Sequence, residues 1–346
     1  MNPDSNSAAT LRGLTLLLRT AATVAVTLTA LLCVTFALSA LSPVDPALKL
    51  MGEHASAASY QQARHRLGLD QPWPQRLGHY ATGVVQGDFG VSQSTGAPVA
   101  LDLRRVFPAT LELATLAMLV STLLGIALAV ASAARPGGVV DALVRVLSLA
   151  GNSLPIFWLG LLGLSLFYAR LQWVGGPGRL DDAYEYTIDM PTGVVLLDAW
   201  RSGVDGALAS AFSHLVLPVL LLSAYAVGNI ARLTRAALLA EANKEYVLLA
   251  RATGTGALKV LLHHMLPNAA GVLLTILALT YTNLLQGAVL VETVFARPGI
   301  GRYLTTALFA ADTPAILGST LVIGACFVLI NGVTDLLVRL LDPRSA

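Results

Sequence analysis

Histidines and glycine-rich runs are the residue patterns in this chain that could support metal binding or phosphate chemistry. His263 and His264 are adjacent, and adjacent side chains on a helix point about 100° apart, so the two imidazoles cannot share a metal ion as an i, i+4 pair can. The run GTGALK at residues 254–259 lacks the spacing of the phosphate-binding loop G-x-x-x-x-G-K-[ST]. A serine nucleophile elbow and an H-E-x-x-H metal helix are also missing. The sequence therefore predicts no catalytic residue, no metal site and no cofactor.

The same histidines belong to a polar segment, EYVLLARATGTGALKVLLHHMLPNA at residues 245–269, that lies between two apolar stretches. Residues 242–253 are good helix formers, and Gly254 and Gly256 interrupt them where a chain reversal needs a positive φ. A second short helix is expected over residues 257–265, before Pro267. The pattern predicts a helix-turn-helix against the bilayer. Periodicity alone leaves open whether it docks a partner or only anchors the loop as an interfacial helix.

The elements that position this segment are expected to be membrane-spanning helices. The chain has 346 residues, of which 55% are hydrophobic and 12% charged, whereas an ordinary soluble domain has roughly 25% charged residues. A bilayer core needs about 20 residues of helix. Six stretches lack an ionisable side chain, and we expect one span in each: Thr20–Val44, Leu113–Ala134, Val146–Ala169, Leu215–Ala231, Met265–Val291 and Thr313–Thr334. The first could instead be a cleavable signal peptide, although its length favours a span.

The charges flanking these spans predict the orientation of the chain. With a cytoplasmic N-terminus, basic residues outnumber acidic ones on the inside and acidic residues outnumber basic ones on the outside. We therefore expect residues 1–19 to be cytoplasmic, residues 20–44 to form the first transmembrane helix and residues 45–108 to form an extracytoplasmic domain. Residues 109–346 would hold the other five transmembrane helices, a second outside insertion at 172–212, the cytoplasmic loop 242–268 and a cytoplasmic C-terminus.

Several segments, in order along almost the whole chain, resemble the permease subunits of ABC importers. Ala250-x-Ala252-x-Gly254, followed by Leu266-Pro267, resembles the EAA loop of that family, and EYVLLARATG resembles its form in peptide and nickel permeases. Other similar segments are RHRLGLDQPWPQRLGHY at 64–80, GDFGVSQSTGAPV at 87–99, PATLELA at 108–114, SLPIFWLGLL at 153–162, HLVLPVL at 214–220, GAVLVETVFARPGIGRYL at 287–304 and LDPR at 341–344. As a whole, the chain resembles the first of the two permease subunits of a dipeptide, oligopeptide or nickel importer.

The resemblance implies a type I ABC importer permease fold, all-α, in the bacterial inner membrane. Its expected partners are a second homologous permease, two cytoplasmic ATPase subunits that hydrolyse ATP, an extracytoplasmic substrate-binding protein and the lipid membrane, but no nucleic acid. The cargo would be peptides or a related small solute such as nickel or a metal chelate, and the sequence does not decide between them. The residues expected to couple the chain to an ATPase are Glu245, Tyr246, Ala250, Arg251, Ala252, Gly254, Leu266 and Pro267.

Within the coupling loop the chain departs from the family pattern. Leu248 and Leu249 stand where the family commonly has Arg and Thr, and Thr253 stands where it often has Lys. Thr255-Gly256 replace the usual Leu-Ser. These changes remove positive charge from the outer face of the loop, so we expect docking to rest on shape rather than on charge pairing.

A second candidate region is ETVFARPGIGRYL, residues 292–304, which follows the fifth span on the expected outside. Pro298, Gly299 and Gly301 predict a tight turn before a short helix that begins near Arg302. The segment could be an ordinary exposed loop, but its apolar side chains favour a re-entrant element at the outer mouth of a pore. The residues expected to form this outer gate, or to contact the binding protein, are Glu292, Phe295, Arg297, Pro298 and Gly299.

Two other classes of protein are alternatives to an importer subunit. A secondary transporter usually has carboxylates or broken helices near the midplane, whereas Glu112, Glu292 and Asp335 are expected at span ends. A membrane-embedded enzyme or scaffold is the third class. The uncharged polar residues and prolines within the spans could form kinks and interhelical hydrogen bonds or line a translocation path: Asn152, Pro155, Pro218, Asn283, Gln286 and Asn331.

Overall fold

The computed structural model describes residues 21–37, 47–48, 56–66 and 68–341. The expected cytoplasmic segment 1–19 and the C-terminal residues 342–346 lie outside the described residues. Among the described residues the secondary structure is helical, apart from an isolated bridge between Val91 and Pro98. The predicted all-α class is confirmed.

Four described helices are long and apolar enough to cross a membrane, and two shorter apolar helices accompany them. The long ones are Val99–Ala134, Ala207–Glu241, Ala270–Val294 and Thr313–Val338, and the shorter ones are Ala21–Ala37 and Ile156–Arg170. Each contains most of one of the six uncharged stretches, in the predicted order. The second of the six begins at Val99, well before the uncharged stretch that starts at Leu113.

The third uncharged stretch, Val146–Ala169, is not one continuous helix as predicted. Helix α6 (Val139–Ser153) ends within this stretch, Leu154 and Pro155 are extended, and α7 (Ile156–Gly163) begins after them. The residue before a proline is disfavoured in the α conformation, which explains the break. Helix α7 then continues into the π-helix η1 (Leu164–Arg170). The apolar stretch is thus divided by a proline break.

The chain forms two compact units, which we describe separately. The first contains residues 1–104 and 303–332, and the second contains residues 105–302 and 333–346.

The remaining helices are α3 (Ala57–Arg66), α4 (Trp73–Val85), α5 (Val99–Ala134), α8 (Asp182–Glu185), α9 (Val195–Ser202), α10 (Ala207–Glu241), α11 (Glu245–Ala252), α12 (Ala257–Val260), η2 (Leu261–Met265), α13 (Leu266–Asn268), α14 (Ala270–Val294), α15 (Ile300–Phe309) and α16 (Thr313–Leu341).

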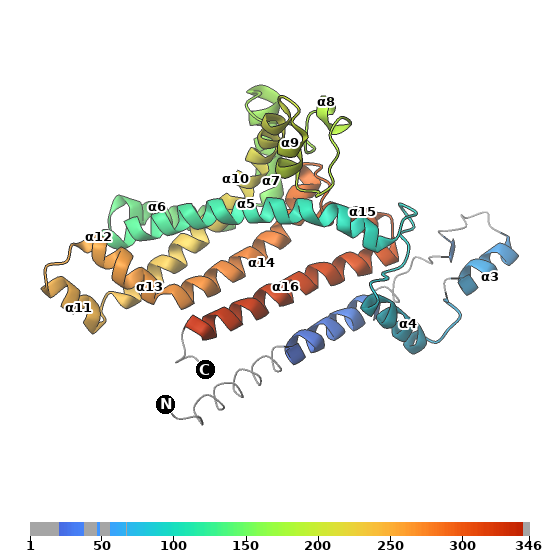
Figure 1. Ribbon diagram of the computed structural model, residues 1–346, viewed down its shortest axis with the longest axis horizontal. Helices are drawn as coiled ribbons and strands as arrows, with labels where there is room; N and C mark the ends of the chain where they lie inside the picture. Colours follow the sequence, from blue (N-terminus) through green and yellow to red (C-terminus); the bar gives the residue numbers. More distant parts are fainter. Residues whose placement is uncertain (1–20, 38–46, 49–55, 67, 342–346) are drawn as a thin grey trace. The chain divides into compact units, whose positions relative to one another are not determined.

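Helix α10 is the central element of the second unit. It packs against α6, α7, α9 and α14, and Figure 1 shows α10 and α14 side by side, with α11 to α13 at one end of the pair. Buried leucine and alanine side chains form the core, among them Leu222 on α10 and Leu284 and Ala288 on α14. Helices α11 to α13 connect the end of α10 to the start of α14.

In the first unit, carboxylates hold the segment before α5 against the start of α16. The Ser92 hydroxyl donates to Asp312 over 2.6 Å, and the Ser94 backbone N–H donates over 2.9 Å. The Thr95 and Tyr303 hydroxyls donate to Asp102 over 2.6 and 3.1 Å. These bonds add to the backbone hydrogen bonds of the irregular segment 86–98, such as those from Ser92 to Ala97 and from Gly96 to Ser92.

Candidate functional site

The turn between α11 and α12 has the predicted backbone. Gly254 has a φ of +81°, and its N–H donates to the Arg251 carbonyl while that of Thr255 donates to the Ala250 carbonyl. A Cβ added at Gly254 would meet nothing within 4 Å. Glycine is therefore required at this position by conformation and not by lack of space. The expected helix-turn-helix is confirmed, with its first helix over Glu245–Ala252.

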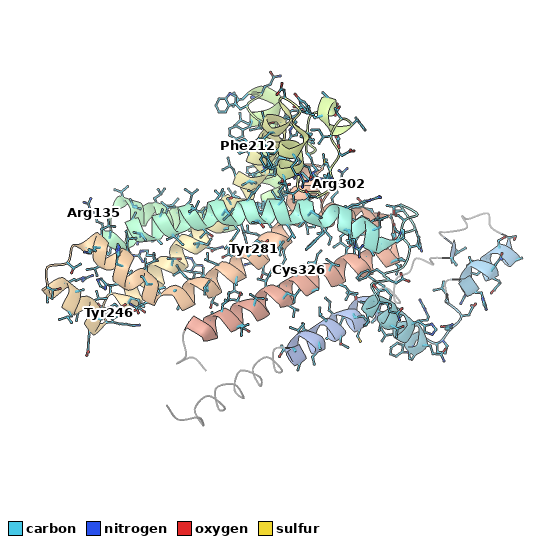
Figure 2. All side chains as sticks on the ribbon, in the orientation of Figure 1. Arg135, Phe212, Tyr246, Tyr281, Arg302 and Cys326 are labelled. Atoms are coloured by element: carbon cyan, nitrogen blue, oxygen red, sulfur yellow. The ribbon has the colours of Figure 1, made fainter. Side chains whose placement is uncertain are left out.

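The inner side of the loop is fastened to α10 by a small core and two hydrogen bonds. Val247, Val260, Leu261 and Met265 cluster with Leu238 of α10. The Tyr246 hydroxyl, on the residue labelled in Figure 2, donates to one carboxylate oxygen of Glu241 over 2.6 Å, and the Lys244 ammonium donates to the other over 2.6 Å. Burial, followed by the bond to Glu241, raises the pKa of Tyr246 to about 12. These contacts pack the loop firmly against the end of α10.

The outer side of the loop presents apolar side chains to the surroundings. Leu248 and Leu249 on α11 are 54% and 67% exposed, and Leu258 on α12 is 59% exposed. We call these three residues the loop patch. Of the predicted coupling residues, Glu245, Arg251, Ala252, Gly254 and Pro267 are exposed, whereas Tyr246, Ala250 and Leu266 are half-buried. An apolar patch of this kind is typical of a protein-binding surface.

A buried ion pair, which sequence reasoning missed, supports the same end of the second unit. Asp141 on α6 is 2% exposed and lies 2.6 Å from the Arg235 guanidinium of α10. The Gly137 N–H and the Ser132 hydroxyl also donate to this carboxylate, over 2.9 and 2.8 Å. These two bonds, followed by the charge of Arg235, hold the pKa of Asp141 below its usual value. The pair joins α6 and α10 to the end of α5.

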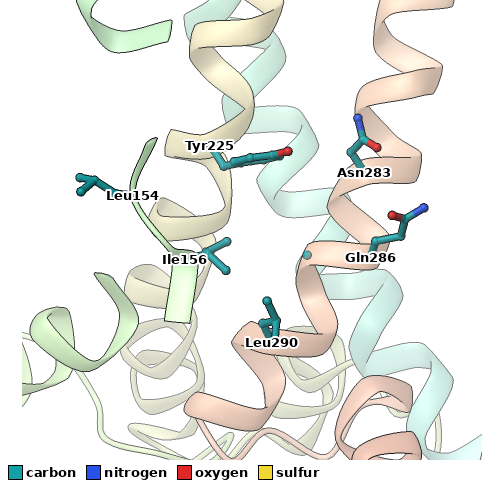
Figure 3. A pocket seen from close by; sticks show the side chains of 7 residues that line it. Leu154, Ile156, Tyr225, Asn283, Gln286 and Leu290 are labelled. Atoms are coloured by element: carbon teal, nitrogen blue, oxygen red, sulfur yellow. The ribbon is translucent and has the colours of Figure 1, made fainter. Parts of the chain in front are cut away.

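A cavity of about 310 Å³ lies in the second unit between α10, α14 and the proline break. Figure 3 shows Tyr225 of α10 facing Asn283 and Gln286 of α14, with Leu154 and Ile156 on one wall and Leu290 at one end. Among the described residues, no charged side chain lines it. Asn283 and Gln286 thus line a cavity, which is what a place in a translocation path would require of them. Asn331 instead donates to the Phe327 carbonyl of its own helix, and the Asn152 side chain lies outside the described part of the chain.

The turn after α14 folds back on its own helix. The Gly301 and Arg302 N–H groups donate to one oxygen of the Glu292 carboxylate over 2.7 and 3.3 Å. A Cβ on Gly299 would overlap that carboxylate. The Ile300 N–H donates to the Thr110 hydroxyl of α5 over 2.8 Å. The predicted tight turn is present, and the following helix begins at Ile300, close to the expected Arg302.

The structure brings the predicted gate residues together but buries most of them. Glu292 and Arg297 are 0% exposed and Phe295 is 1% exposed, so these three side chains leave no surface for a docking protein. The Arg297 guanidinium lies 3.6 Å from the Glu112 carboxylate of α5 and has no hydrogen-bond partner among the described residues. Burial lowers the pKa of Arg297 to about 10. Direct contact of these side chains with another protein would require the turn to open.

Two charged residues near this turn, Glu112 and Arg179, were not predicted to take part in it. The Glu112 carboxylate accepts the Val195 and Leu196 N–H groups at the start of α9, over 3.2 and 2.9 Å. Arg179 is 6% exposed and donates to the Gly193 carbonyl. One hint of this arrangement is present in the sequence, because Glu112 is a lone carboxylate just before an apolar stretch. A carboxylate that is buried in such a place needs a partner.

Comparison with known proteins covers nearly the entire chain. Residues 121–346 match the profile of the family described as binding-protein-dependent transport system inner membrane component, and residues 13–114 match the profile of its N-terminal region. A probable D,D-dipeptide transport system permease protein of Escherichia coli is 43% identical over 90% of this chain and 91% of its own length. A di/tripeptide permease of Pseudomonas aeruginosa is 40% identical over 90% and 92%, and a dipeptide permease of Haemophilus influenzae is 40% identical over 92% and 95%.

Proposed function

Because this chain belongs to the family of inner membrane components of binding-protein-dependent transport systems, we propose that it is a permease subunit of an ATP-driven importer of di- or oligopeptides. The names of its relatives refer to dipeptides and tripeptides, which favours peptides over nickel or a metal chelate. The chain itself catalyses no reaction, and ATP is hydrolysed on separate subunits.

The observation that carries the proposal is the loop between α10 and α14. Its inner side is fastened to α10, its outer side exposes the loop patch, and the two helices that it joins line the cavity. An ATPase subunit bound to the patch would thus move both cavity walls. We assign ATPase contact to Glu245, Arg251, Ala252 and Gly254 together with the patch, and a supporting role to Tyr246, Ala250, Leu266 and Pro267.

The chemistry of the cavity suits a peptide in transit. Tyr225, Asn283 and Gln286 offer hydroxyl and amide groups that can donate to and accept from peptide bonds. The lining holds no charge that would bind the termini of a peptide strongly. A path of this kind binds its cargo weakly, so selection is left to an extracytoplasmic binding protein.

Alternating access follows from this arrangement. A second, homologous permease completes the path, and closure of two ATPase subunits tilts α10 and α14 together. Moving a two-state gate from 1:99 to 99:1 needs about 5.5 kcal/mol, which must come from nucleotide and partner binding. Phe295 and the turn that holds it close the opposite end of the path. We place residues 1–19 and 242–268 in the cytoplasm and residues 45–108 outside.

Co-purification in mild detergent tests the docking step. We expect tagged chain to retain the ATPase subunits, and Leu249→Asp in the loop patch to release them, because a carboxylate would have to be buried unpaired in the interface. Leu197→Asp is the matched control, since Leu197 is an exposed leucine on α9. Retention of the ATPase subunits by Leu249→Asp would refute docking through the patch. Uptake by the chain alone, without ATP, would instead indicate a secondary transporter.

A further inference from the structure

An apolar groove runs through the first unit. Its volume is about 640 Å³, within the usual range of ligand sites. One wall is the helix at residues 21–37, the second is α4 and the third is α16. The side chains that line it are almost all apolar, among them Leu28, Leu32, Leu77 and Leu321. Because α16 is long and apolar enough to cross a membrane and residues 21–37 form a shorter apolar helix, we expect lipid tails to be the apolar molecules nearest to the groove.

A smaller cavity of about 270 Å³ adjoins the groove, and Phe89 lines both. We call it the polar cavity because charged and polar side chains join the apolar ones in its lining. Its lining includes Arg76, His79 and Tyr80 of α4. The Arg76 guanidinium lies 5.7 Å from the centre of the Phe36 ring, and no ion pair of Arg76 is found in the described part of the chain. The Tyr80 hydroxyl is buried and lacks a hydrogen-bond partner among the described residues.

The two cavities lie in order along the helices that form their walls. The polar cavity is lined by Phe36, near the end of the helix at residues 21–37, and by Thr313 and Pro314, at the start of α16. The apolar groove is lined by residues farther along both helices, from Cys33 back to Ala25 and from Leu321 to Ala325. A polar pocket at the helix ends, leading to an apolar groove along the helices, matches the head and tail of a phospholipid.

The charge of the polar cavity indicates which phospholipid. Two described acidic residues flank α4: Asp70 pairs with Arg64 over 3.3 Å, and the Asp88 carboxylate accepts the Gly90 N–H over 2.8 Å. Among the described residues neither forms an ion pair with Arg76, whose guanidinium brings a positive charge to the lining of this cavity. A phosphate oxygen offers Arg76 a charge-assisted hydrogen bond and gives the Tyr80 hydroxyl an acceptor.

From these observations we propose that the first unit binds one anionic phospholipid, with its phosphate at Arg76 and Tyr80 and an acyl chain between the helix at residues 21–37 and α16. The lipid fills the space between the first apolar helix and α16, which contact each other where Leu31 packs on Gly324. It thereby fastens the first helix to its unit. The proposal does not depend on the cargo or on ATP.

Photo-crosslinking in the reconstituted complex tests the site. The probe is phosphatidylglycerol with a diazirine midway along one acyl chain, and the labelled residues are mapped by mass spectrometry. We expect labels at residues 25–33, 77–85 and 321–325, competed by unlabelled phosphatidylglycerol but not by phosphatidylcholine. Arg76→Gln should reduce these labels about fivefold, the contribution of one basic residue at an anionic membrane surface.

Two further variants keep the test decisive. Ala81→Phe, which fills the groove, should abolish labelling of residues 321–325, and Arg201→Ala, at an exposed arginine of α9, should leave it unchanged. Equal labelling by phosphatidylglycerol and phosphatidylcholine probes, or no effect of Arg76→Gln, would overturn the proposal. The proposal would also be overturned if no lipid labels appeared and Cys33, which lines the groove, crosslinked to another subunit. In that case a helix of the other subunit would occupy the groove.

Discussion

At the scale of single residues, Gly254 is the position in the loop where a positive φ requires glycine. Its φ of +81° lies in the left-handed region, where a β-branched residue is strained by about 1–2 kcal/mol. Gly254→Val should misdirect α11 and reduce ATP-driven uptake in proteoliposomes. Gly254→Asn should retain most of the activity, because asparagine tolerates this region better than other residues. Equal uptake by both variants and the wild type would show that the turn does not depend on glycine.

A second residue-scale prediction concerns Asp141 and pH. The folded pKa of this carboxyl is lowered by its bonds to Gly137 and Ser132 and by Arg235, so its stabilising contribution is present above the ordinary pKa of aspartate and is lost as the pH falls through the lowered value. Asp141→Asn should therefore lower the melting temperature at pH 7, and the difference from wild type should shrink below about pH 4. The exposed Asp189→Asn is the control. A constant difference across the pH range would contradict the ionic role.

At the scale of elements, the helix-turn-helix and its φ at Gly254 could be predicted, because the loop's glycines and Leu-Pro pair are local signals. At Pro155 the sequence predicted only a possible kink, because a proline inside an uncharged stretch does not by itself distinguish a bent span from the complete break seen at Leu154–Pro155. Burial of Glu292 and Arg297 could not be foreseen, because their surroundings include Glu112, which is distant in sequence. The spacing of Asn283 and Gln286 predicts one helix face, but it does not reveal that Tyr225 lies opposite.

The turn after α14 gives an element-scale prediction. Phe295 is buried in the core of the second unit, and truncating such a side chain costs about 3–5 kcal/mol. If the turn closes the path, Phe295→Ala should also raise basal ATP hydrolysis and solute leak by loosening the resting state. Leu103→Ala, a buried truncation in the first unit, controls for loss of stability alone. Identical leak and basal hydrolysis in the two variants would leave Phe295 with a packing role.

Charge reversal at Arg297 is a poor probe of binding-protein contact. The guanidinium is completely buried beside Glu112, so a carboxylate at this position would bring two like charges together away from water. The expected result is misfolding rather than a selective loss of stimulation. Contact of Glu292 or Arg297 with a binding protein stays a prediction that needs an opened state of the turn.

At the scale of the whole molecule, the orientation in the membrane remains a prediction from charge alone. On a background without Cys33 and Cys326, the protein's two cysteines, single cysteines at positions 88, 181 and 254 should separate the two sides. We expect an impermeant thiol reagent added to intact cells to label positions 88 and 181 but not 254. Labelling of position 254 from outside would reverse the proposed topology and move the loop away from any cytoplasmic ATPase.

The central claim is that this chain forms the peptide path of an ATP-driven importer, and transport by the reconstituted complex tests it most directly. The measurement is uptake of a labelled dipeptide into proteoliposomes that contain the chain, its second permease and the ATPase subunits, with binding protein and ATP on opposite sides of the bilayer. We predict uptake only when ATP faces the loop and binding protein faces the other side, and loss of uptake in Leu249→Asp. Uptake without ATP, or undiminished ATP-driven uptake by Leu249→Asp, would contradict the account.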